Sequence, residues 1–235
     1  MKILWFTHVI FPDLAEAIES QITVRNGWTY SLAKDLINSN VELHVITTSP
    51  LFSNFSKKVN GIHYHLLQSK KSPLIYDKSL EHKFKSTIAK VNPEMIHIHG
   101  TEYAHSLVLM RACPNEKYVI SIQGLVSVYS KYYLGDITPV DIIKSITIRD
   151  LLKMDNLFQQ RKKFAKMGKL EIESIRRSPN ILGRTSWDQS HARAINPECA
   201  YYVCNRTFRH SFYEDNKWEL NNICLLYTSP SPRDS

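Results

Sequence analysis

The clearest hydrophobic pattern along the chain lies in residues 95–124. Two short runs rich in Ile and Val, MIHIHG and YVISIQG, each close on a glycine, and one helix-length segment separates them. A strand, a helix and a second strand in this order form the repeat from which parallel sheets are built. The pattern therefore predicts an α/β fold with a parallel sheet.

The same alternation extends over most of the chain. Strands are expected over residues 2–8, 41–48, 61–67, 180–183 and 200–204, and helices over 28–39, 79–90, 140–155, 157–177 and 187–195. Loops are expected over 11–26 and between 48 and 61, with an irregular stretch around Tyr129, Tyr132 and Tyr133. One unit, a strand followed by a helix, repeats throughout, which indicates an α/β domain.

Polar residues follow each of the two central strands. His99, Gly100, Thr101 and Glu102 come after the first, and Gln123 and Gly124 come after the second. Ligands of open α/β sheets bind beyond the carboxyl ends of the strands, where loops meet helix N-termini. We therefore expect the binding site at these two clusters.

Three further residues are candidates for the same crevice. His8 ends the first strand and either points into the crevice or serves as a buried structural histidine. Gly27 precedes a helix, so a ligand can approach backbone N–H groups at the positive helix end. Arg184 offers five fixed donors to phosphate or carboxylate, whereas helix capping accounts for Thr185 and Asp188.

The loop before Gly27 lacks the glycine signatures of NAD-binding and ATP-binding domains, which argues against both kinds of domain.

Metal ligation is a weaker interpretation of the histidines. His97 and His99 alternate on one strand and so face the same way, as two zinc ligands would, but no third ligand accompanies them in the sequence. Histidines packed in the sheet and at its edge are the commoner arrangement. Glu102 is expected at a helix start, where the dipole favours a carboxylate whether or not it contacts a ligand. We expect no metal and no cofactor.

Composition and length fit one domain of this kind. The chain has 235 residues, 43% of them apolar, and no apolar run reaches the length of a membrane span. Lys2 leads directly into a strand without a signal-peptide pattern, which predicts a cytoplasmic protein. Apart from Cys224, which belongs to the tail set aside below, the cysteines are Cys113, Cys199 and Cys204. They have neither the spacing of a zinc site nor the even number of a disulfide framework.

The last residues, 224–235, differ in pattern from everything before them and resemble a translated sequencing adapter. We set them aside as a non-native scar. The native domain is then expected to end near Ile223, in the middle of a longer gene.

The formal net charge of +8 is unevenly spread. Between Lys144 and Arg177 the chain carries ten Lys and Arg against four Asp and Glu. Such a run is often only a solvated helix face. Sharper interpretations are contact with anionic lipid or with a ligand phosphate. Nucleic acid is not expected, because no basic and aromatic interleaving or known module accompanies the charge.

Several stretches resemble one family. KILWFTHVIFP, GWTYSLAKDL, VELHVITT, PEMIHIHG, the strand ending in QG, and NILGRTSWDQSHARAINP are together similar to the N-terminal domain of GT-B glycosyltransferases of the group 1, or family 4, kind. The resemblance implies a Rossmann-like, doubly wound parallel sheet over residues 1–223. It also implies a second domain, not contained in this stretch, that holds most of the nucleotide-sugar donor. The implied activity is sugar transfer to a glycan or lipid-linked acceptor in bacterial surface polysaccharide synthesis, at the inner face of the membrane where the acceptor is a lipid.

The resemblance also assigns residues. Gly27 corresponds to a glycine-rich turn that lets the donor's phosphates approach the backbone, with Asn26 in place of the second glycine that is common there. Gln123 stands where many members have a histidine that contacts the transferred sugar. Glutamine can hydrogen-bond a hydroxyl but cannot transfer a proton at neutral pH. A base must then come from elsewhere, or the donor's phosphate takes the acceptor proton, as is suggested for retaining relatives.

Two other functions are compatible with these residues, namely a GT-B-shaped sugar-nucleotide epimerase and a non-catalytic sugar-binding domain. The paired glutamates that would distinguish a transferase belong to the family's second domain. We expect the chain alone to be inactive, because transfer needs donor and acceptor held together across two domains.

Overall fold

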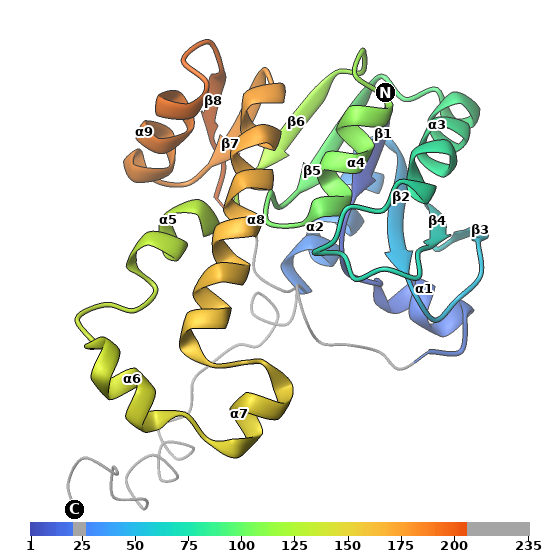
Figure 1. The fold of residues 1–235 in the computed structure, drawn as a ribbon. Helices are drawn as coiled ribbons and strands as arrows, with labels where there is room; N and C mark the ends of the chain where they lie inside the picture. The colour runs from blue at the N-terminus through green and yellow to red at the C-terminus, as the bar shows by residue number, and fades with distance from the viewer. Residues whose placement is uncertain (21–26, 206–235) are drawn as a thin grey trace, which may run out of the picture.

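The computed structural model describes residues 1–20 and 27–205. They form an α/β domain around one eight-stranded sheet of order β3-β4-β2-β1-β5-β6-β7-β8 (Figure 1). Neighbouring strands run parallel except β3, which pairs antiparallel with β4. The prediction of an α/β domain with a parallel sheet is therefore confirmed.

The strands are β1 (Lys2–Phe6), β2 (Glu42–Ser49), β3 (Phe55–Val59), β4 (Ile62–Gln68), β5 (Met95–His99), β6 (Tyr118–Ser121), β7 (Asn180–Gly183) and β8 (Ala200–Val203). The helices are α1 (Pro12–Ala17), α2 (Gly27–Ile37), α3 (Ser79–Val91), α4 (Ala104–Ala112), α5 (Val126–Tyr132), α6 (Pro139–Ser145), α7 (Ile148–Lys153), α8 (Leu157–Arg177) and α9 (Ser186–Ile195). Predicted elements recur close to their expected bounds, including α2, which begins at Gly27.

Helices cover both faces of the sheet, which makes it doubly wound. Leu4 and Phe6 of β1 share one apolar cluster with Phe84 of α3. Ile3 and Trp5 of the same strand pack on the other face with α1 and α2. Because both faces are buried, the strand reads as a continuous apolar run rather than an alternating one.

The long helix α8 has two different halves. Its buried residues, Met167, Gly168, Glu171, Ser174 and Ile175, all lie in the second half, which packs against α4, α5 and α9. The first half carries α6 and α7 away from the sheet (Figure 1). This projecting region, residues 129–166, comprises the last part of α5, α6, α7 and the first half of α8, and is called the basic arm below. None of the described helices is long and apolar enough to cross a membrane.

Two predicted loops are wrong. The stretch 11–26 contains α1, which begins with Pro12 at its first position and buries Leu14 and Ala15 against the sheet. The stretch between 48 and 61 contains β3, whose sequence FSKKV lacks apolar alternation. This strand is an exposed edge that pairs with β4 as a hairpin. Its sequence signal is the two-residue turn Asn60-Gly61, with positive φ at both residues, which the expectation of a loop did not take into account.

Two helix predictions are also corrected. The stretch around Tyr129 and Tyr132, expected to be irregular, is helix α5. The expected helix 140–155 is divided into α6 and α7, because Ile146 is extended and Thr147 starts a new helix through a capping box with Asp150.

Candidate functional site

Most of the predicted site residues meet at the carboxyl ends of β1, β5, β6 and β7. Two backbone hydrogen bonds extend the sheet past its last strand residues. The N–H of Gly100 donates to Ser121 O over 3.0 Å, and the N–H of Ile122 donates to Leu182 O over 2.9 Å. The first bond holds the loop after β5 against β6, and the second holds the loop after β6 against β7, so the clusters around Gly100 and Gln123 lie along one edge of the sheet.

His99 lies at the centre of this edge and is 3% exposed. Its ring centroid lies 4.4 Å from that of Trp5, 4.0 Å from that of His97 and 6.0 Å from that of Trp28 in the first turn of α2. Burial, reinforced by His97, lowers the pKa of His99 well below its usual value. Within the described residues, neither ring nitrogen of His99 has a hydrogen-bond partner. The neutral ring can thus give one donor and one acceptor to a hydroxyl, but it is too weak a base to take a proton.

His97 faces the same way as His99, as the strand alternation predicts. Its Nε2 lies 2.6 Å from the hydroxyl oxygen of Ser121, and burial lowers its pKa to about 4. His97 is therefore a satisfied histidine packed in the sheet beneath His99.

The loop after β5 depends on Gly100. Its φ of +96° lies in the left-handed region, and a Cβ there would lie 2.7 Å from Oε2 of Glu102. The Glu102 carboxylate consequently folds over this backbone. Helix α4 begins only at Ala104, with Tyr103 as its N-cap, so the expectation that Glu102 stands at a helix start is wrong.

His8 enters the same edge from β1. Its Nε2 lies 3.1 Å from Oγ of Ser106, and that hydroxyl donates to Gly100 O over 3.4 Å. Nε2–H of His8 is therefore the donor to Ser106, which leaves Nδ1 as an acceptor, and Nδ1 has no partner among the described residues. Burial, with a smaller effect of nearby His105, lowers the pKa of His8 well below its usual value.

His105 of α4 also lies at this edge but was not among the site residues predicted from the sequence. Its side chain is fully buried. Its Nδ1 lies 3.0 Å from the hydroxyl oxygen of Thr48 at the carboxyl end of β2, and burial lowers its pKa to about 4. Its only sequence signal is a histidine inside the apolar helix AHSLVLM, and apolar helices also bury structural histidines.

Thr101 belongs to the frame of the site. It has no exposed surface and its hydroxyl donates to Glu171 of α8. The same carboxylate caps the start of α5 at Val126 and Ser127. Glu171 was missed because it lies some seventy positions from Thr101, within what reads as a charged surface helix.

Gln123 and Arg184 lie together at the far end of the edge. The Arg184 guanidinium donates to Gln123 O over 3.4 Å, and Asp188 fixes the Arg184 backbone N–H at 3.1 Å. Thr185 caps α9, as predicted, by accepting the Asp188 N–H. The Arg184 side chain is otherwise exposed. Gly124, the last residue of this cluster, packs beneath the ring of Tyr129.

Gly27 begins α2 next to Trp28, whose ring faces His99, so the helix start lies over the same edge. Asn26, the other residue assigned to this turn, lies outside the described residues.

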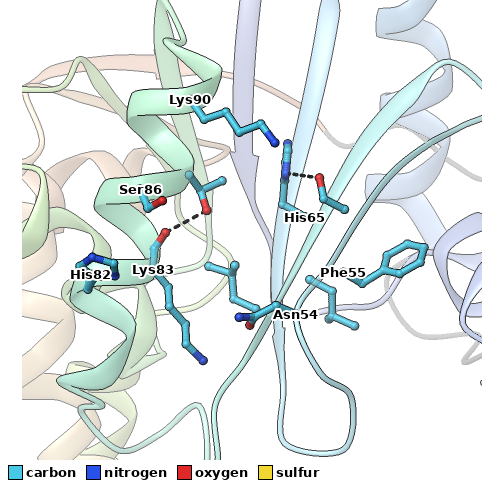
Figure 2. Close-up of a pocket in the computed structure, with 11 residues that line it drawn as sticks. Asn54, Phe55, His65, His82, Lys83, Ser86 and Lys90 are labelled. Carbon is cyan, nitrogen blue, oxygen red and sulfur yellow. Dashed lines mark hydrogen bonds between the residues drawn. The ribbon is translucent and has the colours of Figure 1, made fainter.

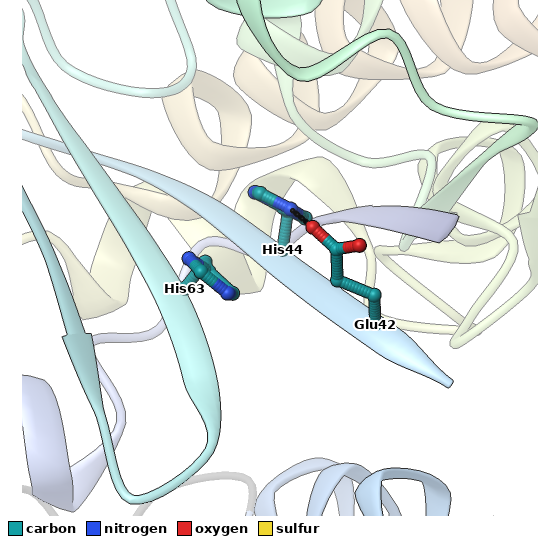
Figure 3. Close-up of side chains that lie close together, drawn as sticks. All are labelled: Glu42, His44 and His63. Carbon is teal, nitrogen blue, oxygen red and sulfur yellow. Dashed lines mark hydrogen bonds and ion pairs between the residues drawn. The ribbon is translucent and has the colours of Figure 1, made fainter. Parts of the chain in front are cut away.

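One group in the described part of the chain places possible metal ligands together, namely Glu42, His44 and His63, whose ligand atoms lie within 4.8 Å of one another (Figure 3). The His44 and His63 rings are stacked 4.5 Å apart at 14°, so their lone pairs run parallel instead of converging. Lys2 also places its ammonium 3.6 Å from the Glu42 carboxylate. This geometry suits hydrogen-bonded histidines better than a tetrahedral metal.

No family model matches the sequence, and no curated protein matches it. Among solved structures, sucrose-phosphate synthase from Thermosynechococcus elongatus aligns with a TM-score of 0.50 and 12% identity, over 86% of this chain and 47% of that one. UGT73P12 from Glycyrrhiza uralensis, complexed with glycyrrhetinic acid 3-O-monoglucuronide, aligns with a TM-score of 0.45 and 11% identity, over 87% of this chain and 48% of that one.

The chain thus spans about half the length of these structures. At such low identity the first alignment shows the fold alone. That fold is the Rossmann-like α/β architecture found in GT-B glycosyltransferases.

Proposed function

We propose that this chain is the acceptor-side domain of a GT-B glycosyltransferase, which transfers a sugar from a nucleotide-sugar donor to a glycan or lipid-linked acceptor in surface polysaccharide synthesis. The observation that carries the proposal is the convergence of His8, His99 and Gln123 at the carboxyl ends of β1, β5 and β6. Neutral imidazoles and an amide supply the donors and acceptors that a hydroxyl-rich ligand needs. The edge also lies where open α/β sheets bind ligands.

In this proposal the domain binds and orients the acceptor but does not take its proton. Burial lowers the pKa of both His8 and His99 well below the usual value, and glutamine cannot transfer a proton. The acceptor oxygen forms a bond to the anomeric carbon while the bond from that carbon to the donor's phosphate breaks. The leaving nucleoside diphosphate then takes the acceptor proton, which is the retaining route.

Donor phosphates are the proposed partners of two further groups. The N-terminus of α2 at Gly27 presents backbone N–H groups next to the His99 edge. Arg184 presents an exposed guanidinium beside Gln123. Both lie on the side of the sheet edge that a second, donor-binding domain would face in this proposal.

The surface of the basic arm supports a membrane location for the domain in this proposal. It exposes a series of large apolar side chains: Tyr129, Tyr132, Ile137, Val140, Ile143, Ile148, Leu151, Leu152, Met154 and Phe158. Leu151 and Leu152 are 61% and 81% exposed, so they do not pack against the sheet. Basic residues stand among them: Lys144, Arg149, Lys153, Arg161, Lys162 and Lys163. An apolar and basic surface of this kind binds anionic lipid, and we propose that the arm rests on the membrane that carries the acceptor.

A transfer assay tests the proposed function. This chain alone should give no product with UDP-, GDP- or ADP-sugars, and a longer protein that adds the donor-binding domain should release nucleoside diphosphate only when an acceptor is present. Conversion of the nucleotide sugar without an acceptor would indicate the epimerase instead. Sugar binding without any conversion would indicate a non-catalytic domain.

A further inference from the structure

A pocket lies far from the sheet edge described above. It has a volume of about 360 Å³ and lies between α3 and the β3–β4 hairpin (Figure 2). In the strand order of the sheet, β3 and β4 are at the opposite end from β6 and β7. Small-molecule sites in proteins commonly begin near this size.

The pocket is cationic. Lys83 and Lys90 of α3 line it, together with His65 and His82, and none of its lining residues is acidic. In the described part of the chain, neither lysine takes part in an ion pair. Two uncompensated ammonium groups over one pocket favour an anion there.

The polar groups around the pocket are oriented as donors. The Lys83 ammonium donates to Gln68 O, which holds the side chain in place and leaves two further N–H groups. Asn54 accepts the Gln68 N–H through Oδ1 at 2.8 Å, so its NH₂ group remains as a donor. Figure 2 shows Lys83 and Asn54 at one end of the pocket, and Lys90 extending toward His65 at the other.

A chain of hydrogen bonds runs from the pocket into the sheet. Ser56 Oγ lies 2.9 Å from His65 Nδ1, His65 Nε2 lies 2.9 Å from His44 Nδ1, and His44 Nε2 lies 3.0 Å from the Glu42 carboxylate. A carboxylate can only accept, so with both rings neutral every proton in the chain points toward Glu42. The Ser56 hydroxyl then donates a hydrogen bond to Nδ1 of His65, and its oxygen lone pairs face the pocket.

If His44 and His65 together take up one proton, the hydrogen bonds from His44 to His65 and from His65 to Ser56 change direction. His44 then donates through both nitrogens, His65 donates to Ser56, and the Ser56 hydroxyl proton is free to point into the pocket. An anion in the pocket favours this second arrangement, because it gains a donor and a positive charge nearby.

We propose that this pocket binds the phosphate or sulfate group of a small polar ligand through Lys83, Lys90, Asn54 and Ser56, and that the His44–His65 pair takes up a proton when the anion binds. The inference is independent of the proposed glycosyl transfer, because the pocket lies at the β3–β4 end of the sheet and shares no residue with the proposed acceptor site.

Several charged groups set the pH response of the pair. Those facing it are His63 of β4, Lys90 of α3, Lys58 of β3, and Glu42 with its partner Lys2. Burial, with the neighbouring His44, His63 and Lys90, lowers the pKa of His65 to about 4. His65 is therefore neutral at pH 7 when the pocket is empty, and proton uptake on binding makes the affinity rise as the pH falls.

Isothermal titration of the full chain with inorganic sulfate tests the site, because sulfate keeps its charge between pH 6 and 8. Binding should be tighter at pH 6 than at pH 8 and at least about tenfold weaker in Lys83→Gln/Lys90→Gln. Lys85→Gln is the matched control, an exposed lysine of α3 outside the pocket, and should bind as the parent does. Ser56→Ala should bind sulfate with a much smaller pH dependence, whereas Lys85→Gln should keep the full dependence.

A second measurement does not depend on any variant. Sulfate should protect Lys83 and Lys90, but not Lys85, from acetylation by acetic anhydride in the parent chain. Equal sulfate affinity in the double variant and the Lys85 control, or no protection, would overturn the site. Loss of binding to phosphatidylglycerol vesicles in Lys83→Gln/Lys90→Gln would assign the pocket to a lipid headgroup and overturn the small ligand. A Ser56→Ala chain with the full pH dependence would overturn the proton coupling.

Discussion

Glu171 of α8 accepts two hydrogen bonds from Ser127 of α5, one from its backbone N–H at 2.9 Å and one from its hydroxyl at 2.6 Å. The carboxylate also accepts the N–H of Val126 at 2.9 Å and the hydroxyl of Thr101 at 3.2 Å. It thereby satisfies the N–H groups at the start of α5, which have no partner within that helix. One buried side chain joins α8, α5 and the loop after β5.

Removing this carboxylate should destabilise the domain strongly. Glu171→Ala leaves two buried N–H donors and the Ser127 and Thr101 hydroxyls without a partner, so we expect the free energy of unfolding to fall by about 3 kcal/mol or more. Glu171→Gln keeps the shape and one acceptor oxygen and should cost less. Urea denaturation measures both. Lys169→Ala, an exposed change in the same helix, should cost under about 0.5 kcal/mol, and an equal loss in both alanine variants would contradict the role of Glu171.

Buried neutral histidines should make the domain sensitive to acid. His65, His97 and His105 each have a pKa lowered to about 4, mainly by burial. Burial also lowers the pKa values of His8 and His99 well below their usual value. These groups bind protons in the unfolded chain below pH 6.5 but not in the folded one. Stability is therefore complete above pH 6.5 and is lost as the pH falls from 6.5 toward 4.

Each such histidine contributes a slope of up to about 1.4 kcal/mol per pH unit within this window. Urea denaturation should show that the free energy of unfolding decreases steeply from pH 7.5 to pH 5. His97→Gln should flatten the slope, while His82→Gln, an exposed site, should leave it unchanged. A flat profile in the parent chain would show that these histidines are protonated in the folded state.

Membrane contact through the basic arm can be tested by vesicle sedimentation. The protein should bind vesicles that contain phosphatidylglycerol and not those of phosphatidylcholine alone, and added salt should weaken the binding. Reversal of Arg161, Lys162 and Lys163 to Glu should abolish it, since each basic residue near the surface adds about 1 kcal/mol.

Two controls distinguish the arm from overall charge. Reversal of Lys57, Lys70 and Lys78 gives the same net charge on exposed residues away from the arm and should have little effect. Leu151→Ser/Leu152→Ser removes apolar contact without changing charge and should weaken binding. If the parent protein stays in the supernatant at low salt, the arm is a solvated face and the acceptor is not reached from a membrane.

The sequence predicted the parts of the fold that depend on local patterns. Apolar runs predicted β1, β2, β4 and β5, and the capping signal at Thr185 marked the start of α9. Strand β3 was missed because its sequence FSKKV lacks an apolar pattern, although the Asn60-Gly61 turn joins it directly to β4. Helix α5 could not be found from local patterns, because it begins where Glu171, 45 positions further along the chain, caps it.

The site followed a similar division. The rule that ligands bind at the carboxyl ends of strands located His99, Gly100 and Gln123, which the structure brings to one edge. It did not indicate His105, which α4 brings in, or the hydrogen-bond chain from Ser56 to Glu42, which crosses three strands. Burial and ring orientation, which determine the histidine pKa values, are also not properties of a local pattern.

The most direct test of the proposed function is the effect of Gln123→Ala on sugar transfer by a protein that joins this domain to its donor-binding domain. Because Gln123 is partly exposed within the proposed site, kcat/KM should fall at least about tenfold with no change in melting temperature. Gln189→Ala on α9 is the matched control and should transfer as the parent does. Equal rates for Gln123→Ala and the parent would contradict an acceptor site at this edge of the sheet.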